Sequence, residues 1–354
     1  MDLKIVTIRK ATAEYPRHSE AAIVELPAGR LLMAWQEYTQ SELGGSDHAP
    51  NRIAAMVSTD EGLSWGEHRV LVEPESGDVN VYSPSFLYLP SGELLLFTFR
   101  YQVLEAGKPP QTTATIRRST DNGQSFAQPQ LVWKNKPYGC ASSVLKLLTC
   151  GRMIIPIAKQ VGAVWSKTDH SLAGIIYSDD EGATWHECET WVDLPLRGAM
   201  EPHLEELTDG RLLMVMRTQL GSVFKSYSQD RGVTWSLAQS TGLMAPESCP
   251  ELVRIPQRGE LMMVWNNSPY DPSWASHYGK RTPLTIARSQ DEGETWIDFQ
   301  EIENHPARAY SNPACTFTKN GKGILTYWVA RYKESGYMDN SLLDLKAAIF
   351  DPRW

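Results

Sequence analysis

The sequence predicts an all-β protein, a β-propeller of six blades with four antiparallel strands each. Two periodic signals support this prediction. An octapeptide of the form S-x-D-x-G-x-[S/T]-[W/F] occurs five times, and its aspartates are Asp60, Asp121, Asp180, Asp230 and Asp291. Glycine-containing turns break apolar runs six times, and their glycines are Gly29, Gly92, Gly151, Gly210, Gly259 and Gly321. A fixed spacing of this size indicates a repeat architecture, and two hairpins per unit of roughly 60 residues suit a propeller blade.

The octapeptide has the composition of a tight turn, as in SQDEGETW at 289–296. Serine and aspartate side chains hydrogen-bond to nearby backbone groups and hold a turn, and glycine adopts positive φ angles without a steric clash. The closing aromatic residue is a large apolar anchor for neighbouring structure. Each copy follows a short run with strand character, such as 53–57 or 173–177. We therefore expect each octapeptide to close a β-hairpin and to have a structural role.

The six glycine turns predict six further hairpins, each continuing into an apolar strand such as 31–35, 94–99 or 212–216. Five of these hairpins are followed by an octapeptide, whereas the sixth continues into residues 346–350, where an octapeptide would otherwise begin. Because a ring of blades must close, we expect the first strand, near residues 3–6, to join the last blade.

Composition limits the remaining possibilities. The 354 residues are 42% hydrophobic and include twelve tryptophans, without a linker-like tract, which predicts a single propeller domain over residues 1–354. No apolar run approaches the length that spans a membrane, and the N-terminus lacks the pattern of a signal peptide, so we expect a cytoplasmic protein. The five cysteines are scattered without metal-ligand spacing, and we expect neither metal nor cofactor.

The net charge of −8 argues against nucleic acid as a partner. It also means that any site for an anion has to be built by local clustering of arginines, against the overall field of the protein. The sequence does not indicate an oligomeric state.

The five octapeptides resemble the Asp-box, or BNR, repeats of the sialidase (neuraminidase) superfamily, and they are spread over nearly the whole chain. This resemblance implies a six-bladed β-propeller that hydrolyses glycosides of an acidic sugar. The same turn recurs in unrelated β-proteins, so function has to be argued from the site.

Polar segments precede the first strand of each expected hairpin, at 17–20, 82–85, 139–142, 200–203, 248–251 and 310–313. The innermost strand of each blade lines the central channel of a propeller. Six polar strand entrances that point to one axis predict a ligand pocket.

The resemblance implies a triad of arginines that grip the substrate carboxylate, and it assigns this role to Arg17, Arg217 and Arg281. In place of the family's Y-R-I-P string, this chain has YPRHSE at 15–20, so a surface arginine paired with Glu14 or Glu20 is the alternative for Arg17. Lys280 competes with Arg281, but the planar guanidinium binds a carboxylate with two parallel hydrogen bonds.

The string MEPHLEELTDGRLLMVMR at 200–217 is close to the family string that carries the catalytic glutamate and the second arginine. The resemblance therefore makes Glu201 the partner of the nucleophile, with Glu205 and Glu206 as the structural alternatives. Arg100 ends a strand of the second unit in the place that Arg217 has in the fourth. It is expected either to add a cation to the pocket or to be an exposed strand-end residue.

The resemblance also implies that Tyr310, in the string AYSNP, is the nucleophile and that Asp47, in the loop GGSDHA, is the general acid/base. A packing role for Tyr310 and a turn role for Asp47 are the structural alternatives, and His48 is a second proton-donor candidate. Glu251 also follows a strand entrance and receives no role.

A tyrosine nucleophile suits sialic acid because that sugar carries a carboxylate on its anomeric carbon, which would repel a carboxylate nucleophile. The expected activity is exo-hydrolysis of a terminal α-linked sialic acid or similar acidic sugar with retention of configuration, and Tyr310→Phe is expected to abolish most turnover. A non-catalytic propeller that binds an acidic glycan or a protein, and a glycosidase for a different acidic sugar, are the alternatives.

Overall fold

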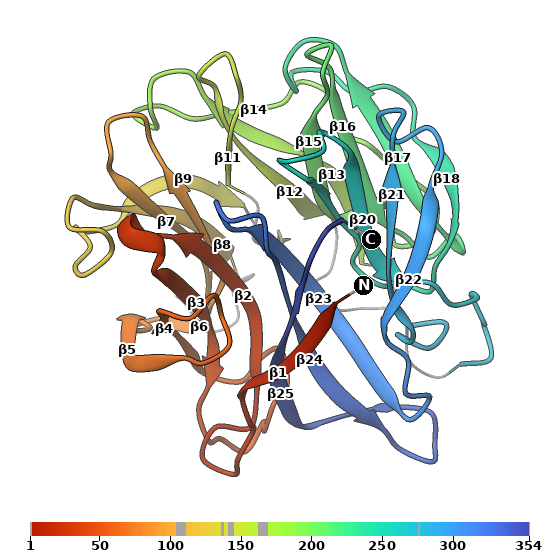
Figure 1. Ribbon diagram of the computed structural model, residues 1–354, viewed down its shortest axis with the longest axis horizontal. Coiled ribbons are helices and arrows are strands. Elements are labelled where there is room, and N and C mark those ends of the chain that lie inside the picture. Colours follow the sequence, from red (N-terminus) through yellow and green to blue (C-terminus); the bar gives the residue numbers. More distant parts are fainter. Residues whose placement is uncertain are drawn as a thin grey trace.

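The computed structural model describes residues 2–103, 111–135, 138–140, 145–161, 169–274 and 277–353. Its strands form six antiparallel sheets that follow one another around a ring in chain order (Figure 1). The first strand of each blade lies at the centre, where it contacts the first strands of adjacent blades, as β2 does with β6 and β23. The predicted six-bladed propeller is therefore confirmed.

The first three blades, innermost strand first, have the following strands. They are β2 (His18–Glu25), β3 (Leu31–Tyr38), β4 (Asn51–Ser58), β5 (Gly66–Val72), then β6 (Asp78–Tyr88), β7 (Leu94–Gln102), β8 (Gln111–Ser119), β9 (Gln130–Asn135), then β10 (Tyr138–Cys140), β11 (Lys146–Leu147), β12 (Met153–Val161), β13 (His170–Ser178) and β14 (His186–Glu187). In the third blade β10 and β11 both pair with β12 and share the innermost place.

The last three blades follow the same order. Their strands are β15 (Met200–Glu206), β16 (Leu212–Arg217), β17 (Ser222–Ser228), β18 (Gln239–Met244), then β19 (Glu251–Arg254), β20 (Leu261–Asn266), β21 (Leu284–Ser289), β22 (Ile297–Glu303), then β23 (Arg308–Phe317), β24 (Gly323–Tyr332) and β25 (Met338–Phe350).

The ring is closed by β1 (Leu3–Arg9), which pairs antiparallel with β25 as the outermost strand of the sixth blade, with Leu3 opposite Phe350. This confirms the predicted place of the first strand. It also explains why the sixth unit has no octapeptide. The other octapeptides connect the third strand of a blade to its fourth, and here the fourth strand comes from the opposite end of the chain.

The octapeptide turns have one shared hydrogen-bond pattern, shown here for the first blade. The Oδ1 atom of Asp60 accepts from Ser58 Oγ at 2.8 Å and from the Ser64 backbone N–H at 2.9 Å, and Gly62 N–H donates to Ser58 Oγ at 2.9 Å. Gly62 has φ of 88°, which a side chain would disfavour. Trp65 Nε1 donates to the Gly62 carbonyl at 3.0 Å and packs against the sixth blade, so the turn also joins adjacent blades.

The hydrophobic core lies between neighbouring blades, as where Val264 and Ile286 of the fifth blade pack with Leu325 and Tyr327 of the sixth. Burying each such side chain stabilises the fold by about 1.5–3 kcal/mol. The described residues include one short 3-10 helix, η1 (Pro27–Gly29), and none of their helices is long and apolar enough to cross a membrane.

A β-bulge interrupts the inner strand of four blades and prepares the site. The register against the second strand shifts in β2, β6, β15 and β23. At each bulge one residue other than glycine has a positive φ angle, and these residues are Glu20 (49°), Ser83 (51°), Glu201 (40°) and Asn312 (48°). Each lies nine residues before the turn glycine of its blade. Such backbone conformations cost free energy and persist where the surrounding structure requires them.

Candidate active site

A cavity lies at the centre of the ring, and all four bulge residues line it. Glu20 and Glu201 come from the first and fourth blades, which face each other across a six-bladed ring. Ser83 and Asn312 come from the second and sixth blades. The cavity is therefore a polar pocket at the strand entrances, where the sequence predicts it.

The three predicted arginines, Arg17, Arg217 and Arg281, all line this cavity. They come from the first, fourth and fifth blades, so residues distant in the sequence meet around one space. Asp47 and Glu201 line it as well. The structure thus brings together five of the six residues predicted for the site.

Arg217 is bound between two carboxylates. Its Nη1 donates to Glu201 Oε2 at 2.8 Å and its Nη2 donates to Glu247 Oε1 at 2.9 Å. Burial lowers the pKa of Arg217, but Glu201 and Glu247 outweigh this and raise it well above its ordinary value. Arg217 is therefore a fixed cation of the cavity wall.

Arg17 holds the loop that carries Asp47. Its Nη1 donates to Asp47 Oδ1 at 2.5 Å and to the Gly45 carbonyl at 3.1 Å, and its Nε donates to Ser19 Oγ at 3.0 Å. The guanidinium lies over the ring of Tyr38, 4.6 Å from the ring centre. Arg17 is thus buried and ordered by the loop.

Arg281 is the cation of the triad whose charge is least compensated. Its Nη1 donates to Ser311 Oγ at 2.9 Å and its Nη2 to the Glu247 backbone carbonyl at 3.0 Å, and no carboxylate among the described residues forms an ion pair with it. Burial lowers the pKa of Arg281, and the neighbouring Arg217 lowers it further. A buried guanidinium with neutral partners that faces a cavity favours an anionic ligand.

The two predicted acids are both held in the charged form. The Asp47 side chain is 68% exposed, so the effect of burial, which raises its pKa, is limited, and the ion pair with Arg17 lowers the pKa below its ordinary value. Burial likewise raises the pKa of Glu201, but Arg217 and the hydrogen bond from the Cys249 thiol lower it below its ordinary value. A carboxylate held in the charged form is a poor proton donor in this state, and the general-acid role of Asp47 stays a prediction.

Glu20 is a third carboxyl group at the cavity, and the sequence predicts it only as a possible partner of Arg17. Burial raises the pKa of Glu20 to about 7; Arg17 opposes this shift, whereas Glu201 and Asp47 support it. Its Oε2 accepts hydrogen bonds from Ser83 Oγ at 3.0 Å and from Gln36 Nε2. Its place nine residues before Gly29 matches that of Glu201 before Gly210, and this signal in the sequence would have identified it.

Tyr310, which the resemblance predicts as the nucleophile, does not lie at the central cavity. Its side chain is 1% exposed. It packs edge-on against Tyr327 in the core between the fifth and sixth blades, and it lines a separate pocket with Glu303. The cause is its position eleven residues before Gly321, whereas the bulge residue of this blade, nine residues before it, is Asn312.

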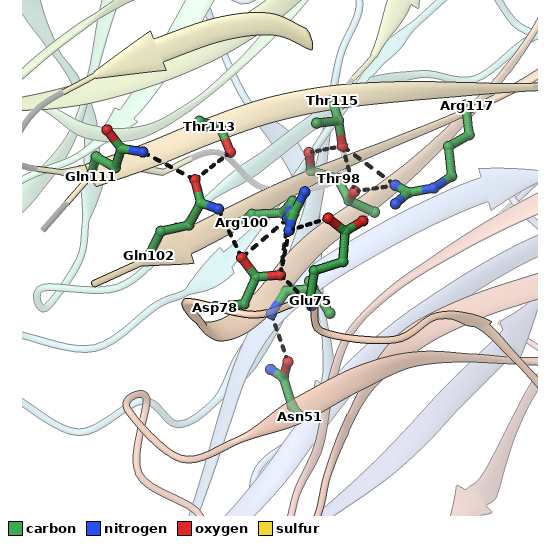
Figure 2. A network of polar contacts seen from close by, with 11 residues as sticks. Asn51, Glu75, Asp78, Thr98, Arg100, Gln102, Gln111, Thr113, Thr115 and Arg117 are labelled. Carbon is green, nitrogen blue, oxygen red and sulfur yellow. Dashed lines mark hydrogen bonds and ion pairs between the residues drawn. The ribbon is translucent and has the colours of Figure 1, made fainter. Parts of the chain in front are cut away.

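Arg100 also lies outside the cavity. It is a partly buried residue of the second blade, where its Nε donates to Asp78 Oδ2 at 2.9 Å and its Nη2 to Glu75 Oε2 at 2.8 Å (Figure 2). Gln102 Nε2 donates to Asp78 Oδ1 at 2.9 Å and extends this network along the strand. Neither the pocket role nor the exposed position expected for Arg100 is found.

The other competing residues do not line the cavity either. The ammonium of Lys280 lies 5.0 Å from the ring centre of Trp274 and donates to the Pro306 carbonyl, so Arg281 is the cation of this segment that reaches the site. Glu251 accepts from the Cys315 backbone N–H at 2.8 Å. His48 is likewise not among the lining residues.

Two further residues of the cavity, Arg197 and His277, were not predicted from the sequence. Arg197 lines the cavity and binds Asp169 through two hydrogen bonds of 2.7 and 2.6 Å, and it also donates to Glu247, which ties it to Arg217. His277 lines the cavity too, and burial, with three nearby arginines, lowers its pKa well below the ordinary value. These residues lie on connections between strands, where no periodic signal marks them. Within the described ranges, no cluster of three or more His, Cys, Asp or Glu residues is placed to hold a metal ion.

Comparison with known proteins gives a family and several relatives. Residues 29–325 match the family model described as a BNR repeat-like domain. The anhydrosialidase of Macrobdella decora is 28% identical over 218 residues, which are 58% of this chain and 27% of that protein. The sialidase of Paraclostridium sordellii is 25% identical over 219 residues, 55% of this chain and 52% of that protein. The chain thus spans about half or less of these relatives.

Among solved structures, the NanB sialidase of Streptococcus pneumoniae has a TM-score of 0.75 with 14% identity, over 98% of this chain and 70% of that chain. At this identity the likeness concerns the fold, and the chemistry has to come from the cavity itself.

Proposed function

The chain belongs to the family of BNR repeat-like domains and is a propeller of the sialidase superfamily, and from this premise we propose that it is a glycosidase that releases a terminal acidic sugar from a glycan. The sialidases among its relatives support an acidic sugar as substrate. The observation that carries the proposal is Arg281, a buried cation that faces the cavity without a carboxylate partner among the described residues.

The carboxylate of the sugar binds Arg281 and the neighbouring Arg217, and Arg17 completes the cationic wall. Arg217 already has two carboxylate partners, so Arg281 contributes most of the attraction for a new anion. Guanidinium groups from separate blades fix the orientation of the sugar ring as well as its position.

The three carboxyl groups at the cavity favour catalysis over binding alone. Asp47 and Glu201 are held charged, whereas the pKa of Glu20 is raised to about 7. Carboxyl groups whose environments separate their pKa values are the usual basis of acid and base roles in glycosidases. Retention of configuration is not part of this proposal, since it depends on a tyrosine nucleophile and Tyr310 lies outside the cavity.

The test is a panel of 4-methylumbelliferyl glycosides, beginning with the α-sialoside and continuing with uronic acids and neutral sugars. We expect cleavage of an acidic glycoside and none of its neutral counterpart. Arg281→Met is expected to lower kcat/KM by about 100-fold, as loss of a charge-assisted contact does. Its unfolding midpoint should stay at or above that of the wild type, because Arg281 has no carboxylate partner to leave unpaired.

The alternative of a non-catalytic propeller makes a different prediction for the same panel. It requires binding of free acidic sugars, measured by calorimetry, without cleavage of any glycoside. Cleavage that ignores the charge of the sugar, or an Arg281→Met variant with unchanged kcat/KM, would contradict the proposed recognition.

A further inference from the structure

Building on the proposed function, we propose that Glu20 is the catalytic proton donor, which protonates the leaving-group oxygen from the wall opposite Glu201. Glu20 and Glu201 occupy the same place in their blades, at the bulge nine residues before the turn glycine, with φ angles of 49° and 40°. Both line the cavity, and their blades face each other across the ring.

The contacts of Glu20 leave one oxygen for a substrate. Both of its hydrogen bonds within the described residues, from Ser83 and Gln36, go to Oε2. A protonated Oε1 can therefore donate to a ligand in the cavity, while Oε2 stays held by its two neighbours. A proton donor needs this combination of fixed position and free donor atom.

The charges around Glu20 allow it to keep a proton near neutral pH. Arg17 lies on the segment before β2 and favours the charged form, whereas Asp47 on the following loop and Glu201 on β15 favour the neutral form. Arg217 and Arg281 also line the cavity, but both are turned to partners on the fourth to sixth blades. Loss of water raises the pKa of Glu20 to about 7; Arg17 opposes this shift, and Glu201 and Asp47 support it.

The reaction step balances without a further reagent besides water. The bond between the anomeric carbon and the leaving oxygen breaks, its electron pair stays on the oxygen, and the oxygen takes the proton of Glu20. Water adds to the anomeric carbon, and its proton passes to the carboxylate of Glu201. Exchange with bulk water then returns Glu20 to the protonated form and Glu201 to the charged form.

The test uses leaving groups of different basicity on the acidic sugar that the wild type cleaves. A 4-nitrophenyl glycoside leaves readily as an anion, whereas a methyl glycoside needs a proton. We expect Glu20→Gln to lose about 100-fold or more of its kcat on the methyl glycoside, the usual contribution of general acid catalysis, and little on the 4-nitrophenyl glycoside. Glu14→Gln, the same change at an exposed position of the same segment, should leave both rates unchanged.

A second variant tests the role without removing the carboxyl group. The hydrogen bond from Ser83 lowers the pKa of Glu20, so Ser83→Ala should move the alkaline limb of the pH profile of kcat to higher pH. Wild-type turnover of the methyl glycoside should fall above pH about 7, and Glu20→Gln should lose this limb.

Each contrary result has a distinct meaning. Equal losses on both leaving groups, or an unchanged alkaline limb in both variants, would remove Glu20 from proton donation while the proposed glycosidase stands. A wild type that cleaves no acidic glycoside would overturn the glycosidase and this assignment together.

Discussion

Two arginines of this propeller are almost equally buried and similarly paired, yet only one belongs to the site. The side chain of Arg100 in the second blade is 12% exposed and binds Asp78 and Glu75. The side chain of Arg217 in the fourth blade is 11% exposed and binds Glu201 and Glu247. Arg217 lines the cavity, whereas Arg100 lies within the network of its own blade (Figure 2). Burial and charge pairing therefore do not identify the functional residue.

The two arginines differ by one position in their distance from the turn glycine of the blade. Arg217 lies seven residues after its turn glycine and Arg100 lies eight residues after its own. Successive side chains of a strand point to opposite faces, so this step turns Arg100 away from the cavity. Two other residues seven positions after their glycines, Gln36 and Trp328, also line the cavity. Phe99, Ala158 and Asn266 have the same count but do not line the cavity, so the count separates Arg217 from Arg100 without defining the site by itself.

The largest effect should follow from Arg217→Met. The change removes a cation of the cavity and leaves Glu201 and Glu247 without this partner, so we expect kcat/KM for an acidic glycoside to fall by about 100-fold or more. Urea unfolding should show a loss of stability as well, which separates this variant from Arg281→Met. Wild-type kinetics in a folded Arg217→Met variant would contradict the conclusion that Arg217 belongs to the site and Arg100 does not.

Arg100→Met should affect stability alone. It leaves the fully buried carboxylate of Asp78 with the Gln102 amide as its remaining side-chain partner, which is expected to cost about 3 kcal/mol of unfolding free energy. The measurement is urea unfolding at pH 7 beside a kinetic assay corrected for folded protein. A specific loss of kcat/KM without loss of stability would show that Arg100 reaches the site after all.

The fold could be predicted because its signals are local. Each octapeptide holds its own turn through its own side chains, as Asp60 does, and the place of β1 follows from the need to close the ring. The site was predicted best where a family string also contains the turn glycine and so fixes the count to it, although Arg17, Arg281 and Asp47 were placed by their local context alone. Glu201 and Arg217 satisfy that condition, whereas the Tyr-Ser pair at 310 does not, and Glu20 had the right count without a string.

His203, which is buried on the inner strand of the fourth blade, should make the stability of the protein depend on pH. His203 on β15 has the place that Ser85 has on β6, and burial, with Lys146 nearby, lowers the pKa of His203 to about 3. The unfolded chain binds a proton at this histidine below its ordinary pKa of 6.5, and the folded protein does not. This contribution to stability is therefore complete above pH 6.5 and decreases as the pH falls toward 3.

Replacing this histidine should make the protein less sensitive to acid. Between pH 7 and pH 5, His203→Leu is expected to lose about 2 kcal/mol less unfolding free energy than the wild type, because one pKa unit corresponds to about 1.4 kcal/mol. Urea unfolding at both pH values measures this difference. Parallel losses in the two proteins would mean that His203 is protonated in the folded state.

The smallest overall effect should come from Tyr310→Phe, although the motif at 310 predicts the largest effect on turnover. The phenol lies in the core beside Tyr327, and Glu303 interacts with it and helps to raise its pKa to about 12, after burial. Removing the hydroxyl group should cost about 1 kcal/mol of stability and leave kcat and KM for an acidic glycoside unchanged. If turnover disappears instead, the inner strand of the sixth blade must change its register when substrate binds. The count from the turn glycine would then hold for the free protein but not for its complex with substrate.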